Sequence, residues 1–256
     1  MTHSDPGPAH SPGSEPATAG FYGKLPSLGD FITRRLPAQF VQTWDLWLRE
    51  SLAASQSQLA SSWLDHYLTS PLWRFALSAG TAGQTGWIGV LMPSVDRVNR
   101  YFPLTLAAPL APGANPFRSL CAFDWLDRAE SIALSGLADG FDLDTFDAEI
   151  LALGAPASTG EPQDARVADA DDRRGTPDAW RLEVSSPPGL MDACPTLLAE
   201  ALNELFFAYS LWWTSGSERV APSLLVCQGL PAPEGFAALL GGDWTGQGWL
   251  RLGPDG

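Results

Sequence analysis

Large apolar residues recur along this chain with two different spacings, and the spacing changes from segment to segment. Steps of three and four residues predict a helix over 37–54, which Pro37 opens without losing a needed N–H donor. Near alternation predicts a strand over 72–78, and an apolar run that Pro93 ends predicts another over 87–92. A glycine-rich loop joins the two as a hairpin. The same patterns predict further strands at 21–25, 31–35, 102–108, 180–184, 211–214 and 224–228, and helices at 61–67, 117–137, 142–153, 234–240 and from near Pro195.

The order of these elements predicts an α+β fold. Residues 20–140 have the order β-β-α-β-β-β-α, and short connections between neighbouring strands favour an antiparallel sheet flanked by helices. Residues 141–256 are expected to form an α/β C-terminal extension that adds further helices and up to three strands. The pattern leaves open whether this extension continues the first sheet or forms a lobe of its own.

Two stretches lack the apolar residues of a folded core. Residues 1–19 are rich in Pro, Gly, Ser and Ala and have no apolar run, so they predict a disordered arm rather than a signal peptide. Residues 154–178 carry almost no large apolar side chains and predict a mobile surface insertion. The predicted organisation is therefore an arm (1–19), an α+β domain (20–140) and a C-terminal part (141–256) that contains the insertion.

Composition narrows the classes of partner. The chain has 256 residues, of which 45% are hydrophobic, with 11 Trp and 12 Phe, and these are sufficient for a large core. The formal net charge of −14 repels phosphate backbones and argues against nucleic-acid binding. No apolar run reaches the roughly 20 residues that a membrane span needs. We therefore expect a cytoplasmic protein without membrane insertion.

Cysteine and histidine give no support for a disulfide framework or a metal site. Cys121, Cys194 and Cys227 are odd in number and far apart, and apolar neighbours predict that each is a buried free thiol. No CxxC or HxxxH spacing occurs. We expect neither a metal nor a cofactor.

Two catalytic patterns can be tested against spacing, and both fail. Gly80, Gly83 and Gly86 lie between two predicted strands and lack a following lysine, so they predict a hairpin loop rather than a phosphate-binding loop. Ser94 lacks the Gly-x-Ser-x-Gly context, and the neighbours of His66 predict a packed or half-exposed imidazole rather than a catalytic base.

Asp124, Asp127 and Glu130 recur at three-residue steps and share one face of a predicted helix. Such a cluster could hold catalytic carboxylates. Because Arg128 is interleaved and no second acidic motif accompanies them, a solvated helix face is the favoured interpretation.

The connection between the predicted strands 87–92 and 102–108 carries Asp96, Arg97 and Arg100. Binding residues collect on connections that rigid strands hold in place. Two interpretations stay open. In the structural one, Asp96 accepts hydrogen bonds from turn amides and an arginine fixes the connection. In the functional one, arginine is presented to an acidic group of a partner.

Several short motifs follow one another along the chain: GKLPSLGDF (23–31), WDLWL (44–48), PLWRF (71–75), PSVDR (93–97), RYFPL (100–104), SLWWTSG (210–216) and GLP (229–231). Taken together, these motifs resemble one known family, the TagF proteins associated with type VI secretion. The resemblance covers about residues 20–241. Asn99 departs from the glycine expected there, but Asn also tolerates left-handed backbone geometry, so we expect the turn to persist.

The resemblance implies a cytoplasmic, non-catalytic protein that represses type VI secretion after translation. The implied partner is the forkhead-associated (FHA) scaffold protein of the apparatus. The implied fold of the N-terminal part is similar to longin or profilin-like domains. Fold similarity by itself says little about function.

The residues expected to bind the partner, or to fix the turn, are Lys24, Asp30, Asp96, Arg97 and Arg100. A competing hypothesis is an enzyme or small-ligand-binding domain in phospho-protein signalling beside the same apparatus. A third hypothesis is a structural subunit of the secretion machine.

Overall fold

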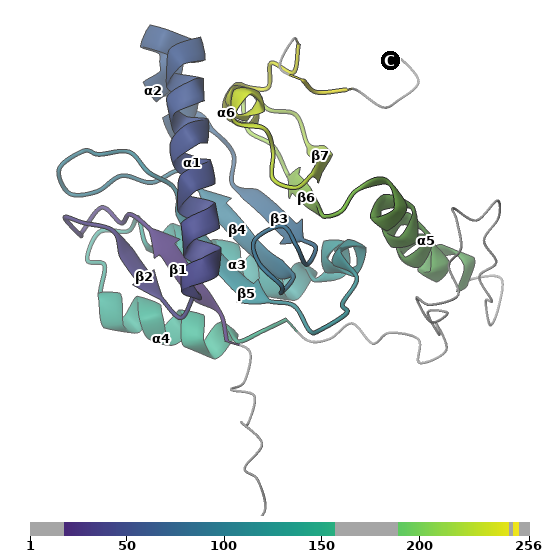
Figure 1. The fold of residues 1–256 in the computed structure, drawn as a ribbon. Helices are drawn as coiled ribbons and strands as arrows, with labels where there is room; N and C mark the ends of the chain where they lie inside the picture. Colours follow the sequence, from purple (N-terminus) through teal and green to yellow (C-terminus); the bar gives the residue numbers. More distant parts are fainter. Residues whose placement is uncertain (1–17, 157–188, 246–247, 251–256) are drawn as a thin grey trace, which may run out of the picture.

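Seven antiparallel strands form one sheet in the order β2-β1-β5-β4-β3-β6-β7 (Figure 1). The computed structural model describes residues 18–156, 189–245 and 248–250. The strands are β1 (Gly20–Gly23), β2 (Ile32–Arg34), β3 (Trp73–Leu77), β4 (Trp87–Met92), β5 (Leu104–Pro109), β6 (Tyr209–Thr214) and β7 (Ser223–Gln228).

Helices cover both faces of this sheet. In Figure 1, α1 crosses one face, while α3 lies on the opposite face. The α-helices are α1 (Ala38–Leu59), α2 (Trp63–Thr69), α3 (Phe123–Ser135), α4 (Leu143–Leu153), α5 (Gly189–Leu205) and α6 (Phe236–Gly241), and short 3-10 helices are η1 (Ala60–Ser62), η2 (Pro116–Cys121) and η4 (Pro233–Gly235).

Two cores result from this arrangement, one on each face. Alternate residues of β4 enter different cores: Val90 faces α3 and α4, whereas Leu91 faces α1, α2 and α6. All six residues of β4 are buried because both faces of the strand are covered. The sheet is therefore a rigid platform for the connection that follows Met92.

The second half of the chain continues the first sheet. Strand β6 pairs with β3 along its length, with Phe75 opposite Trp212, and β7 extends the sheet further. Trp212 packs against Trp44 and Phe75, with ring centroids 5.9 and 5.3 Å apart. Trp213 is half-buried. Because adjacent side chains of a strand point to opposite faces, it lies on the other face of the sheet.

The predicted α+β fold with an antiparallel sheet is confirmed, and so is the hairpin of β3 and β4. The predicted first helix ends too early, because Ser and Gln occupy the positions directly after Ala54 and interrupt the apolar pattern, although α1 continues to Leu59. Ser55 is buried there and accepts a hydrogen bond of 2.9 Å from the indole N–H of Trp63. The comparison of the N-terminal part with longin domains stays a prediction.

Two other helix boundaries differ from the expectation. The segment 117–137 divides into η2 and α3 at Ala122, whose ψ of 47° is not helical. Helix α5 begins at Gly189 and contains Pro195, so the apolar stripe after Pro195 marks where the helix packs and not where it starts. The expected strand 180–184, residues 157–178 of the expected insertion and residues 1–17 of the expected arm lie outside the described residues.

The prediction that every cysteine is buried was wrong. Cys121 and Cys194 are exposed, and Cys227 is half-buried. Cys121 is the last residue of η2, and its apolar neighbours in the sequence do not bury it. Burial depends on which side of the element faces the sheet, and the local sequence does not fix that side.

Candidate functional site

The connection between β4 and β5, residues 93–103, folds back on itself as a tight turn. Val95 and Tyr101 pair across it as an isolated antiparallel bridge. The N–H of Asp96 donates to the carbonyl of Arg100 (3.0 Å), and the N–H of Asn99 donates to the carbonyl of Asp96 (3.0 Å). Asn99 has φ of 62°, which confirms that asparagine holds the left-handed position expected of glycine. The backbone of the turn is thus fixed.

Asp96 is the centre of this turn. The residue is only 2% exposed, and its carboxylate accepts four hydrogen bonds. Oδ1 accepts from the backbone N–H groups of Val98 and Arg100, both at 2.9 Å. Oδ2 accepts from Nζ of Lys24 at 2.8 Å and from Nε of Arg100 at 2.6 Å. Every acceptor direction of the carboxylate is used, so Asp96 has no capacity left for a partner.

Lys24, in the connection between β1 and β2, contacts the carboxylate of Asp96. Its side chain is 5% exposed, and its ammonium lies 4.9 Å from the ring centroid of Phe31 as well as on Asp96. Its backbone carbonyl accepts a hydrogen bond of 2.7 Å from Oγ of Ser94. A buried charge is costly unless it is paired, so Lys24 and Asp96 depend on each other.

The hydrogen bonds decide the ionisation of Asp96. Desolvation alone would raise the pKa of this carboxyl. Hydrogen bonds from Lys24, Arg100 and Val98 outweigh that effect and hold the pKa of Asp96 well below its usual range. Asp96 therefore stays ionised at neutral pH, and its negative charge keeps Lys24 and Arg100 bound to the turn.

The two arginines of the turn differ in what they contact. Arg100 donates from Nε to Asp96 and from Nη2 to the carbonyl of Gly29, although its side chain is 54% exposed. Arg97 is fixed by its backbone, whose N–H donates to the carbonyl of Leu28 at 2.9 Å. The side chain of Arg97 is exposed and makes no hydrogen bond or ion pair with any described residue. Arg97 is thus a free cation on a fixed backbone.

Asp30 lies on the neighbouring connection between β1 and β2. It is exposed, and its carboxylate accepts a hydrogen bond of 2.9 Å from the N–H of Phe31. The structure therefore unites Lys24, Asp96 and Arg100 in one network. It leaves Arg97 and Asp30 on the surface beside that network.

Tyr67 also belongs to this site, although no sequence motif pointed to it. Its hydroxyl donates to the carbonyl of Ser94 (2.8 Å) and accepts from the N–H of Ser94 (3.0 Å). Burial raises the pKa of Tyr67, so the hydroxyl keeps its proton. Tyr67 lies 27 residues from Ser94 in sequence, and no motif joins them.

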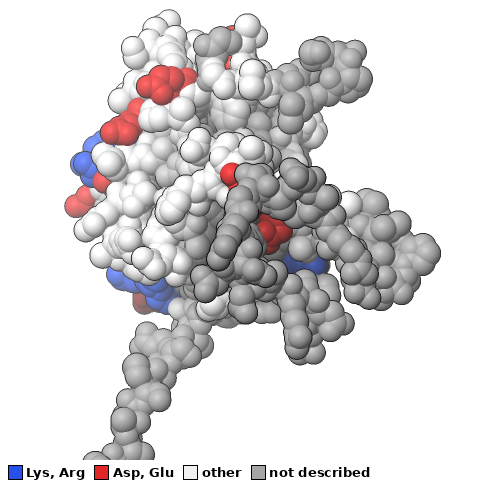
Figure 2. Space-filling view, turned by 45° about the vertical axis from the view of Figure 1, so that its right-hand side comes forward, with Lys and Arg blue, Asp and Glu red and all other residues white. Residues whose placement is uncertain are grey.

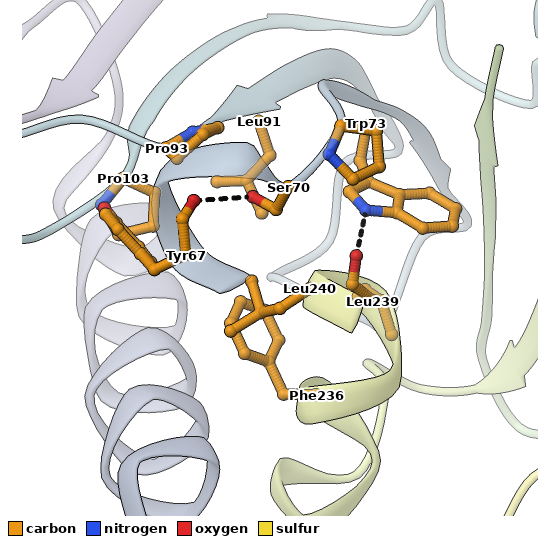
Figure 3. Close-up of a pocket in the computed structure, with 10 residues that line it drawn as sticks. Tyr67, Ser70, Trp73, Leu91, Pro93, Pro103, Phe236, Leu239 and Leu240 are labelled. Atoms are coloured by element: carbon orange, nitrogen blue, oxygen red, sulfur yellow. Dashed lines mark hydrogen bonds between the residues drawn. The ribbon is translucent and has the colours of Figure 1, made fainter. Parts of the chain in front are cut away.

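A small apolar cavity lies beneath the same turn (Figure 3). Tyr67, Trp73, Pro93 and Phe236 are among its lining residues, and Trp73 donates from Nε1 to the carbonyl of Leu239 at 3.1 Å. The cavity has a volume of about 20 Å³, which is room for about one water molecule. It is too small to hold a substrate.

The catalytic patterns weighed from sequence do not assemble in the described residues. Oγ of Ser94 donates to the carbonyl of Lys24, and Nδ1 of His66 lies 2.8 Å from the carbonyl of Ser62. The glycine-rich segment is the loop of a hairpin, where the N–H of Gly80 donates to the carbonyl of Gly83 at 2.7 Å. These groups are engaged in local structure.

The three-residue spacing of the acidic residues on α3 predicted a solvated helix face, but that face is only partly solvated. Arg74 of β3 reaches it and donates to Glu130 and to Asp127, each at 2.6 Å. The hydrogen bond from Arg74 to Glu130 is the main cause of a raised pKa of the guanidinium. Asp124 is exposed. Two of the three carboxylates therefore attach α3 to the sheet.

Charge is distributed in small groups on the face seen in Figure 2. There, Lys and Arg side chains occur in separate places with Asp or Glu nearby, and uncharged side chains cover most of the described surface between them. Within the residues 18–156, 189–245 and 248–250, no three or more metal-binding side chains come together, and no helix is long and apolar enough to cross a membrane.

Fold and site together define a class of protein. It is a mixed α+β protein in which a seven-stranded antiparallel sheet carries a charged turn, and a buried lysine–aspartate pair fixes that turn. Residues 20–153 match the family described as TagF N-terminal domain, type VI secretion system-associated. The chain belongs to the TagF family, as its motifs predicted.

A solved structure extends this likeness to most of the chain. PA0076 from Pseudomonas aeruginosa PAO1 is 35% identical in sequence and superposes with a TM-score of 0.76. The alignment covers 93% of this chain and 99% of PA0076. Among curated proteins, no sequence matches. The resemblance in fold therefore includes the C-terminal half as well as the part that the family describes.

Proposed function

We propose that this protein is a non-catalytic regulator that represses type VI secretion by binding a cytoplasmic component of the apparatus. The FHA scaffold protein is the partner we propose. Membership of a secretion-associated family supports the setting. The observation that carries the binding role is the free guanidinium of Arg97 on a fixed turn.

The turn has the properties of a binding element. Its backbone is held by internal hydrogen bonds and by the bond from Arg97 to Leu28, so little conformational entropy is lost on binding. The Lys24–Asp96 pair is buried and therefore supports the turn without touching a partner. An exposed guanidinium forms two parallel hydrogen bonds with a carboxylate or a phosphate group. We propose that Arg97 contacts such a group on the partner, with Arg100 and Asp30 beside it.

The test is the affinity of purified protein for the purified FHA scaffold protein, measured by calorimetry. Arg97→Glu should weaken binding by at least about tenfold, because it replaces an attraction with a repulsion. The thermal midpoint should stay within about 2 °C of the wild type, since the exposed side chain of Arg97 makes no hydrogen bond or ion pair with a described residue that the change would remove.

Arg128→Glu is the matched control. Arg128 is also an exposed arginine without a hydrogen bond or ion pair among the described residues, but it lies on α3. The same charge change there should leave the affinity unaltered. Equal binding by the wild type and Arg97→Glu would refute the role of Arg97. Absence of any binding by the wild type would refute the proposed partner.

A further inference from the structure

A glycine of the β1–β2 connection lies where the two arginines of the β4–β5 turn come together. Gly29 accepts, through its backbone carbonyl, a hydrogen bond from Nη2 of Arg100. A Cβ atom at position 29 would lie 3.3 Å from Nη2 of Arg97 and 4.0 Å from its Cζ. The N–H of Arg97 also donates to the carbonyl of Leu28, and the two connections lie side by side (Figure 1). Both guanidinium groups therefore lie against one residue that has no side chain.

Both guanidinium groups are accessible and keep hydrogen-bond donors for a partner. The side chain of Arg97 is exposed and makes no hydrogen bond or ion pair with a described residue, so all of its N–H donors are available. Arg100 uses Nε on Asp96 and Nη2 on Gly29, whereas Nη1 has no hydrogen-bond partner in the part of the chain that the structure describes. The side chain of Arg100 is 54% exposed. Two positively charged groups thus offer donors beside Gly29.

The charges of the two connections favour a partner group with one negative charge. Lys24, Arg97 and Arg100 are positive, whereas Asp30 and Asp96 are negative. The excess is therefore a single positive charge, which one carboxylate neutralises. A phosphate group carries about −1.5 to −2 charges at neutral pH. Because Asp30 is exposed and makes no ion pair with a described residue, it repels the additional charge of a phosphate.

Exposed apolar side chains border the two arginines. Phe31 is 40% exposed, and its ring centroid lies 4.9 Å from the ammonium of Lys24. Val98 directly follows Arg97 and is 59% exposed. Apolar contacts that exclude water strengthen a charged hydrogen bond at their centre. A charged centre with an apolar border is typical of a surface that binds a protein side chain.

We propose that Arg97 and Arg100 together bind one carboxylate of the partner, from the side chain of a glutamate or an aspartate. Gly29 is the positioning residue that leaves room for the guanidinium of Arg97 beside that of Arg100. This assignment rests on the proposed function, because it names the chemical group that the turn binds. The backbone of Gly29 is outside the left-handed region, so a larger residue is compatible with the backbone but displaces the guanidinium of Arg97.

A small probe tests the carboxylate site without the partner. The probe is N-acetyl-L-glutamic acid α-amide, whose single charge is the side-chain carboxylate. It is titrated into the full chain while carbon NMR follows the arginine Cζ signals. The signals of Arg97 and Arg100 should shift together, with a midpoint on the order of 30 mM, and that of the exposed Arg128 should not.

Three outcomes of this titration would overturn the proposal. The first is the absence of any shift up to about 200 mM probe. The second is an equal shift of Arg128, which would show that the probe binds any exposed arginine. The third is tighter binding of inorganic phosphate than of the probe at the same ionic strength.

Gly29→Val tests the positioning role. The valine should weaken binding of the probe and of the FHA scaffold protein by at least about threefold, because it displaces the guanidinium of Arg97. The thermal midpoint should stay within about 2 °C of the wild type, since the displaced group is the end of a flexible side chain. In an Arg97→Gln background the valine should cause no further loss, because it acts through that arginine. Additive losses would overturn the positioning role.

Phosphatase treatment of the FHA scaffold protein distinguishes the two kinds of anion on the partner itself. The affinity of the wild-type chain should be the same before and after treatment. A loss of at least about tenfold would show that the bound group is a phosphate and would overturn the carboxylate assignment, while the role of Arg97 in docking would stand. If the scaffold protein did not bind at all, the proposed function would fail, and the probe titration would still decide whether the two arginines bind a carboxylate.

Discussion

At the scale of single residues, the shape of the charged turn depends on the hydrogen bonds that one carboxylate accepts. Asp96 accepts two backbone and two side-chain hydrogen bonds, and its partner Lys24 is equally buried. Both residues were candidates for partner binding from sequence. Both are buried and support the turn, whereas the side chain of Arg97 is exposed and makes no hydrogen bond or ion pair with a described residue.

The depressed pKa of Asp96 predicts a loss of stability in acid. In the unfolded chain, the carboxyl takes up a proton near its ordinary pKa of 3.8, while in the folded protein it stays ionised to lower pH. The unfolded state therefore binds more protons in this range. The contribution of Asp96 is complete above about pH 5 and declines as the pH falls below about 4.

Urea unfolding between about pH 5 and pH 3 measures this effect. Asp96→Asn should be less stable than the wild type at pH 5 and should show a shallower decline below pH 4. Asp124→Asn, which changes an exposed carboxylate on α3, should keep the wild-type slope. If Asp96→Asn declined as steeply as the wild type, the proposed hydrogen-bond network would not control the pKa.

At the scale of elements, one arginine of β3 attaches α3 to the sheet. Arg74 contacts Glu130 and Asp127 at the same distance, but the two carboxylates differ in exposure. The side chain of Glu130 is 28% exposed, and that of Asp127 is 65% exposed. Solvent screens the second contact more strongly, so the two bonds should differ in strength.

Single substitutions can measure this difference. Glu130→Gln should lower the free energy of unfolding by about 1 kcal/mol, because it weakens a half-buried charged hydrogen bond. Asp127→Asn should change it by less than about 0.5 kcal/mol. Urea unfolding of both variants at neutral pH is the measurement. Equal effects of the two substitutions would contradict the role of burial.

At the scale of the whole molecule, the sheet joins the two halves of the chain into one core. Trp212 of β6 packs between α1 and the sheet, against Trp44, Trp47 and Phe75. Residues of α6 close the same core. The part matched by the family description, 20–153, thus depends on residues beyond it to cover its aromatic side chains.

Trp212→Ala should therefore destabilise the entire protein. The substitution opens a cavity beneath α1 and should lower the free energy of unfolding by about 3–5 kcal/mol. Trp213→Ala, at the half-buried neighbour on the other face, is the control and should cost less. Thermal and urea unfolding followed by tryptophan fluorescence and circular dichroism measure both. A loss from Trp212→Ala no larger than that from Trp213→Ala would argue against a shared core.

The sequence predicted the features that depend on near neighbours. The strand Trp87–Met92 was located to the residue, because a continuous apolar run that ends at Pro93 is a local signal. The left-handed position of Asn99 was likewise expected, since it follows from what one side chain allows. The ordered motifs were sufficient to identify the family.

The tertiary structure decided what depends on residues distant in the chain. Lys24 and Asp96 lie 72 residues apart, so no local pattern shows that they neutralise each other in the core. The pairing of β6 with β3 and the exposure of Cys121 likewise depend on which faces of the elements meet. Hydrophobic periodicity shows that one face of a helix or strand is apolar, but only the folded chain shows which residues pack against that face.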